Sequence, residues 1–111
     1  MATNKPAAVQ HLTYGFNQPL NPKVLPTHLQ AITFGREYNQ VILKDVLPEE
    51  LQHLIFGDLY NQSLPIKGLP STLKTIQFGE GFDRSLEDVD WPEGFESLIC
   101  QNHLIPNALN V

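Results

Sequence analysis

Residues 47–64 read LPEELQHLIFGDLYNQSL, and this pattern returns along most of the 111-residue chain. Prolines mark the period, with successive spacings of 20, 22, 22 and 22 residues, at Pro6, Pro26, Pro48, Pro70 and Pro92. The aligned copies share the consensus L-P-x-x-L-x-x-[IL]-x-F-G-x-x-[FY]-N-Q-x-[IL], and the first copy lacks two residues after Gly15. A fixed period of this size predicts a repeat architecture.

Each copy contributes residues to the same apolar columns. The columns are Val9, Leu29, Leu51, Leu73 and Phe95; Leu12, Ile32, Leu54, Ile76 and Leu98; Tyr14, Phe34, Phe56, Phe78 and Cys100; Phe16, Tyr38, Tyr60 and Phe82; and Leu20, Ile42, Leu64 and Leu86. We expect these columns to form a continuous core, because a single copy cannot bury its apolar face alone. All ten aromatic residues lie in repeat columns, so none is left to stack on a ligand.

The spacing Leu-x-x-Ile-x-Phe is compatible with a helix, and Pro48 resembles a helix start. Glycine and proline recur too often for helices of ordinary length, however. The alternation in Ile32-Thr33-Phe34 and its equivalents instead predicts one short strand per copy, with the first and third residues facing inward. The predicted fold is therefore a leucine-rich-repeat-like solenoid of stacked 22-residue coils with a parallel sheet and little or no helix.

Two further columns are typical of tight coils. The glycines Gly15, Gly35, Gly57 and Gly79 indicate a backbone conformation that needs no Cβ. Amide side chains at Asn17, Asn39 and Asn61 are predicted to satisfy backbone groups across successive coils. Asp83 departs from this ladder, because a carboxylate cannot donate, so we expect a different turn there or an exposed place near the end of the stack.

The copies resemble the leucine-rich repeat and, within it, the FNIP-type repeat. Phe16-Asn17-Gln18-Pro19-Leu20 is close to the hallmark of that repeat, and FG followed by [FY]-N-Q recurs at residues 34–40 and 56–62. The resemblance implies a curved solenoid without regular helices that serves as a recognition surface. We assign repeats at about 5–24, 25–46, 47–68, 69–90 and 91–104 within a single domain, 1–111. Residues 105–111 form either a C-terminal cap or the start of a truncated sixth copy, so the chain is either capped or part of a longer array.

Composition and charge exclude several classes of protein. The formal net charge is −5 and basic residues are scattered, so no nucleic-acid partner is expected. Apolar runs are too short for a membrane span, and no signal peptide is visible, so we expect no membrane partner and a cytoplasmic location. A lone cysteine, Cys100, excludes an internal disulfide framework and is consistent with a reducing compartment.

No residue pattern predicts catalysis, and we expect neither a metal nor another cofactor. His11 and His53 share a column but lie two coils apart, roughly 10 Å by strand spacing, which is too far for joint ligation. His28 and His103 lie elsewhere. Cys100 occupies a core column, and the carboxylate pairs Glu49-Glu50 and Glu87-Asp88 are expected on solvated bends.

Function is expected to reside where the copies differ, on the outward strand residues of a concave sheet. The predicted partner-binding residues are His53, Ile55, Thr75, Gln77, Ser97, Ile99 and Thr33. Of these, Ile55 and Ile99 are expected to be exposed apolar positions on a face that is otherwise mostly polar, small and uncharged. The leading hypothesis is a non-enzymatic scaffold that binds a protein partner, and the alternative is a structural spacer or capping fragment of a longer array. Charge is unequal along the chain: residues 1–79 carry six basic and five acidic residues, and residues 80–111 carry one and seven. A partner is expected to turn its basic side toward the C-terminal end; the alternative is a solvated acidic end that keeps the array soluble.

Overall fold

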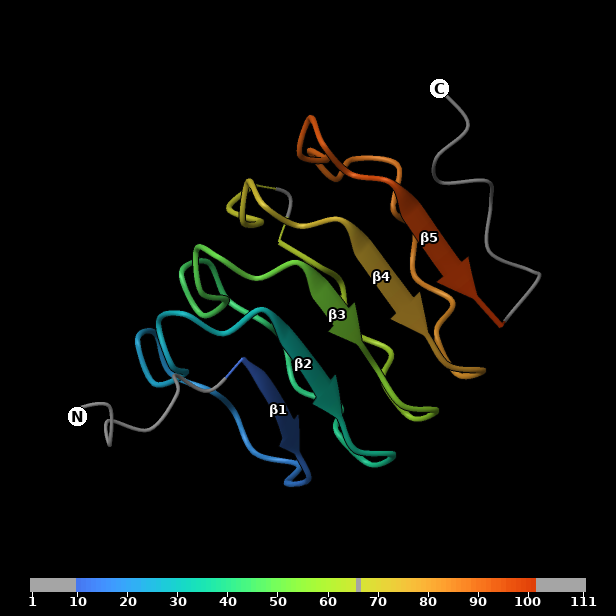
Figure 1. Cartoon of the computed structure of the whole chain (residues 1–111). Helices are drawn as coiled ribbons and strands as arrows, with labels where there is room; N and C mark the ends of the chain where they lie inside the picture. The colour runs from blue at the N-terminus through green and yellow to red at the C-terminus, as the bar shows by residue number, and fades with distance from the viewer. Residues whose placement is uncertain (1–9, 66, 102–111) are drawn as a thin grey trace, which may run out of the picture.

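The computed structural model describes residues 10–65 and 67–101, which form a stack of coils with one parallel strand per copy (Figure 1). The strands are β1 (His11–Tyr14), β2 (Ala31–Phe34), β3 (His53–Ile55), β4 (Thr75–Phe78) and β5 (Ser97–Cys100). They form one sheet in the order β1-β2-β3-β4-β5, and the described residues contain no helix. The predicted solenoid is confirmed. Val9, His103 and the proposed cap or sixth copy at 105–111 lie outside the described residues.

Neighbouring strands pair in the register that the repeat predicts. Ile32 pairs with Leu12 on one side and with Leu54 on the other, and Ile76 pairs with Leu54 and Leu98. Because side chains alternate between the two faces of a strand, this register aligns the inward residues of all five strands. The same register aligns the residues between them on the outward face.

The core is a set of apolar columns that run along the stack. Ile32, Leu54 and Ile76 have no exposed surface. The rings in the third column stack nearly parallel, with centroids 5.2 Å apart between Phe34 and Phe56 and 5.4 Å apart between Phe56 and Phe78. Ring contacts of this kind add to the free energy of burial, so the aromatic columns join one coil to the next.

The predicted amide ladder is present and works through side-chain oxygen atoms. Oδ1 of Asn17 accepts from the backbone N–H of Asn39 at 2.9 Å, and Oδ1 of Asn39 accepts from that of Asn61 at 2.8 Å. Oδ1 of Asn61 accepts from the N–H of Asp83 at 3.0 Å. Asp83 is exposed and forms the last described rung, which is the second of the two outcomes expected for it.

The glycine column has a different cause from the one predicted. Positive φ occurs at Gly68, Lys23 and Asp45, and not at the glycines of the column. A Cβ on Gly57 would instead lie 2.6 Å from Cα of Arg36, and one on Gly79 would lie 2.7 Å from Cα of Asp58. At Gly57 and Gly79, glycine is therefore needed because successive coils approach each other closely just after the strands.

The assignment of Phe16 to the fourth apolar column is wrong. Its side chain is 67% exposed, whereas Tyr38, Tyr60 and Phe82 in the same column are buried. The first copy is two residues shorter after Gly15, so its chain does not carry this ring into the core. Phe16 instead packs edge-to-face on Tyr14, with centroids 5.8 Å apart.

Two buried tyrosines place hydroxyl groups inside the core. Among the described residues, the hydroxyls of Tyr38 and Tyr60 have no hydrogen-bond partner. Burial, with a smaller contribution from Tyr14, raises the pKa of Tyr38 to about 12. Burial, together with Tyr38, also raises the pKa of Tyr60. Phe82 occupies the same column without a hydroxyl, so the column itself does not require one.

Candidate functional site

The outward face of the sheet carries two columns of side chains, and all seven residues predicted to bind a partner lie in them. The first column is His11, Ala31, His53, Thr75 and Ser97, and the second is Thr13, Thr33, Ile55, Gln77 and Ile99. Each residue faces outward because its neighbours along the strand face the core. The short coils hold the two columns in register, so this face is a fixed two-column array.

Histidine and threonine pair across neighbouring strands on this face. Nδ1 of His53 lies 2.8 Å from Oγ1 of Thr75, its register partner on β4. Nε2 of His11 lies 3.0 Å from Oγ1 of Thr33 on β2. These hydrogen bonds orient the imidazole rings, so the face presents polar groups in defined positions. The sequence indicates that these residues share one face, but it does not predict the histidine–threonine pairs.

The two isoleucines expected to be exposed apolar positions differ. Ile99 on β5 is 50% exposed, as predicted. Ile55 on β3 is less exposed than expected, because it is half-buried and is not among the large exposed apolar side chains. The central part of the face is therefore more polar than expected, with Ile55 available only in part.

Other exposed apolar residues lie in the return segments between strands. They were not predicted, and they are Val24, Val41, Leu43 and Leu59, with exposed fractions of 60%, 52%, 58% and 45%. The sequence does carry a signal for some of them. Leu43 occupies a consensus position that is Asn21 in the first copy and Glu87 in the fourth, and Leu59 aligns with Glu37.

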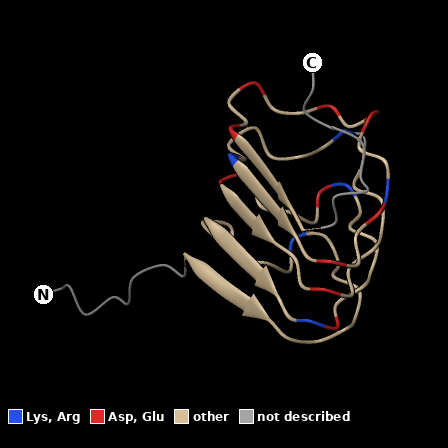
Figure 2. Ribbon diagram, turned by 90° about the vertical axis from the view of Figure 1, so that its right-hand side faces the viewer, with Lys and Arg blue, Asp and Glu red and all other residues tan. Residues whose placement is uncertain are grey.

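Negative charge is concentrated at the β5 end of the stack, where acidic segments predominate in Figure 2. From Glu80 to Gln101 the chain has seven acidic residues and one basic residue, Arg84. The outward columns contain no carboxylate and no Lys or Arg. The outward face is thus nearly uncharged, and the acidic residues lie beside it and beyond it along the stack.

The described histidines His11, His28 and His53 belong to three different copies of the repeat. His11 and His53 are separated by Ala31 in the sheet, as the spacing predicted. His28 lies on a turn, where its Nδ1 is 2.8 Å from Oε2 of Glu50. Over residues 10–65 and 67–101, no group of three His, Cys, Asp or Glu side chains could hold a metal ion.

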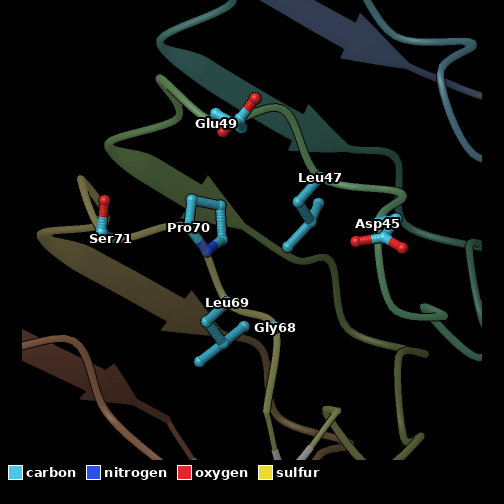
Figure 3. Close-up of a pocket in the computed structure, with 7 residues that line it drawn as sticks. All are labelled: Asp45, Leu47, Glu49, Gly68, Leu69, Pro70 and Ser71. Atoms are coloured by element: carbon cyan, nitrogen blue, oxygen red, sulfur yellow. The ribbon is translucent and has the colours of Figure 1, made fainter.

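A pocket of about 210 Å³ lies away from the outward face, on the segments that precede β3 and β4 (Figure 3). Its lining is Asp45, Leu47, Glu49, Gly68, Leu69, Pro70 and Ser71. Asp45 and Gly68 both have positive φ, so unusual turns shape the pocket. It shares no residue with the predicted partner-binding set, and two carboxylates with a serine specify no reaction.

The part of the chain that the structure describes contains no helix long and apolar enough to cross a membrane.

Comparison with known proteins agrees with the repeat and the fold. Residues 16–59 match the FNIP Repeat family. The crystal structure of CroV588, described as a novel circular LRR protein structure, is similar with a TM-score of 0.76 and 37% sequence identity over 82% of this chain. The matched region is 14% of that protein, so the present chain spans about one seventh of its length. No curated protein gives a significant match.

Proposed function

The chain carries FNIP-type leucine-rich repeats, and we propose that it is a non-enzymatic scaffold that binds a protein partner on the outward face of its parallel sheet. The observation that supports this proposal is the two-column array itself. Ten side chains from five strands share one face, in fixed register and without carboxylate, Lys or Arg. The buried frame repeats from copy to copy, whereas these positions differ, which is how repeat scaffolds distinguish partners.

The proposed contact residues are Thr33, His53, Ile55, Thr75, Gln77, Ser97 and Ile99. The His53–Thr75 pair reduces the side-chain freedom that binding would otherwise remove, which favours affinity. Ile99 offers exposed apolar area beside these polar groups, a combination found at protein interfaces. Acidic residues at the β5 end would steer a basic partner during association, and salt would weaken that effect.

A substitution on the central strand tests the proposal. Tagged wild-type protein and the Ile55→Glu variant would be used to recover partners from the source cells, with quantitative mass spectrometry. Leu59→Glu is the matched control, because Leu59 lies in the same coil, is 45% exposed and belongs to a return segment. Circular dichroism would first show that both variants are folded.

We expect a protein that wild type and Leu59→Glu retain and that Ile55→Glu loses. If both variants recover the same proteins as wild type, the outward face is not the binding surface. The chain would then be better described as a spacer in a longer array. The similarity to 14% of a much longer circular protein favours that second candidate function.

A further inference from the structure

The two edge strands of the sheet carry neither the prolines nor the charged residues that commonly prevent edge-to-edge pairing. Within the described residues, β1 pairs with β2 and β5 pairs with β4, and no strand covers their outer edges. β1 reads HLTY and β5 reads SLIC, with no proline, Lys, Arg or carboxylate in either strand. Edge strands of soluble proteins commonly carry such residues, because an open edge pairs readily with another strand.

The apolar core is also less well covered at the two ends of the stack. Leu12 and Tyr14 in the first coil are only partly buried, as are Phe95 and Leu98 in the last. Their interior equivalents Leu51 and Leu54 have no exposed surface. Another coil placed on either end layer would therefore remove apolar surface from contact with water, which is favourable.

Charge distinguishes the two ends. The described part of the first coil, residues 10–24, contains Lys23 and no acidic residue. The segment from Glu80 to Gln101 has seven acidic residues and one basic residue. Two β5 ends would repel each other, whereas a β5 end and a β1 end are compatible.

We propose that a second copy of this chain stacks end to end on the first, with β1 of one copy pairing in parallel with β5 of the other. The hydrogen bonds between successive coils within one chain show the pattern that this pairing would continue. Ala31, His53, Thr75 and Ser97 each donate an N–H to the carbonyl of the preceding coil, on Gln10, Gln30, Gln52 and Lys74. If this pattern continues across the contact between copies, the N–H of His11 donates to the carbonyl of Glu96 in the second copy.

Cross-linking tests this register directly. In a Cys100→Ser background, one chain carries His11→Cys and another, larger through a tag, carries Ser97→Cys. The proposed pairing puts these two residues opposite each other on adjacent parallel strands, about 4.8 Å apart, which a disulfide can bridge. His11→Cys mixed with Thr75→Cys is the matched control, because Thr75 lies in the same column one coil further away.

We expect the mixed disulfide with Ser97→Cys to form at least tenfold faster than the control product. Equal yields from the two mixtures, or products from identical chains alone, would overturn the proposal. Sedimentation equilibrium of the wild-type chain gives an independent measurement, in which the average mass should rise above 12.5 kDa with concentration. A mass of 12.5 kDa at every concentration would overturn it as well.

Thr13→Pro should abolish the rise in mass while leaving the fold intact. Gly35 donates to the carbonyl of Tyr14 and Ala31 to that of Gln10, so the backbone groups that face β2 belong to alternate residues. Thr13 lies between them, and its N–H points to the open edge, where proline is tolerated. A folded Thr13→Pro variant that associates like wild type would show that β1 is not the contact.

Discussion

Replacing Gly57 by alanine tests the close approach of successive coils. The new Cβ would lie 2.6 Å from Cα of Arg36 and 2.7 Å from the carbonyl oxygen of Gly35. Carbon atoms in good contact are about 3.5–4.0 Å apart, so the two coils would have to separate by roughly 1 Å. Both neighbours are backbone atoms, which cannot rotate away as a side chain can.

The expected loss of stability follows from these contacts. Overpacking of this kind costs about 1–3 kcal/mol. Separation would also weaken the hydrogen bond from the N–H of Leu59 to the carbonyl of Arg36, now 3.1 Å, at about 0.5–1.5 kcal/mol. Alanine also lowers the conformational entropy of the unfolded chain, which stabilises the folded state by about 0.4–1 kcal/mol. The net loss is centred at ~2 kcal/mol within a range of about 0.5–4 kcal/mol, and the central value corresponds to roughly 10–15 °C in Tm for a domain of this size.

Gly15 supplies a control in the same column. A Cβ on Gly15 would meet nothing within 4 Å, and one on Gly35 would lie 3.3 Å from Cα of Gly15. Thermal and urea unfolding of the three alanine variants should therefore give increasing losses in the order Gly15, Gly35, Gly57. Equal unfolding free energies for Gly57→Ala and Gly15→Ala would refute the role assigned to this column.

Three further predictions concern the interior of the stack. Phe56→Ala removes a ring that is 2% exposed and stacked on both sides, and should cost about 3–5 kcal/mol in urea unfolding. Asn39→Ala removes the acceptor for the Asn61 N–H and should cost about 1–3 kcal/mol, whereas Asn39→Asp keeps an oxygen there and should cost less than half as much. Between pH 10 and 11 the wild-type protein should lose about 2 kcal/mol of stability, because the unfolded chain releases its tyrosine protons while Tyr38 and Tyr60 retain theirs. The double variant Tyr38→Phe with Tyr60→Phe should be more stable than wild type at pH 7 and should lack that alkaline loss.

A Phe56→Ala protein that unfolds like wild type would show that the third column does not hold the coils together. If Asn39→Asp is as damaging as Asn39→Ala, the side-chain nitrogen of Asn39 contributes more than its Oδ1. If the double tyrosine variant loses stability at pH 7, the two hydroxyls have partners that stabilise the fold.

Much of the outward face could be predicted, because the sequence contains both the two-residue alternation of a strand and the 22-residue repeat. Alternation within a strand assigns Leu54 inward and His53 outward, and the 22-residue period places Thr75 opposite His53. A parallel stack preserves this order, so position along the chain becomes position along the sheet. The residues of this face could therefore be predicted one by one, whereas the partner could not be.

Interactions between coils depend on distances that no consensus contains. Gly57 is needed because Arg36 of the preceding coil comes close, and nothing in its own sequence distinguishes this cause from a positive φ. The two-residue deletion after Gly15 is visible in the sequence, but only the path of the chain shows that it leaves Phe16 outside the core.

The sequence by itself thus determined the 22-residue coil, the strand in each coil and the facing of the strand columns, because these depend on local alternation and a fixed period. The tertiary structure decided how closely the coils pack, which polar groups they satisfy and which they leave buried, as at Tyr60. Those properties depend on separations of a few tenths of an ångström between segments 22 residues apart, and packing of the whole stack sets them.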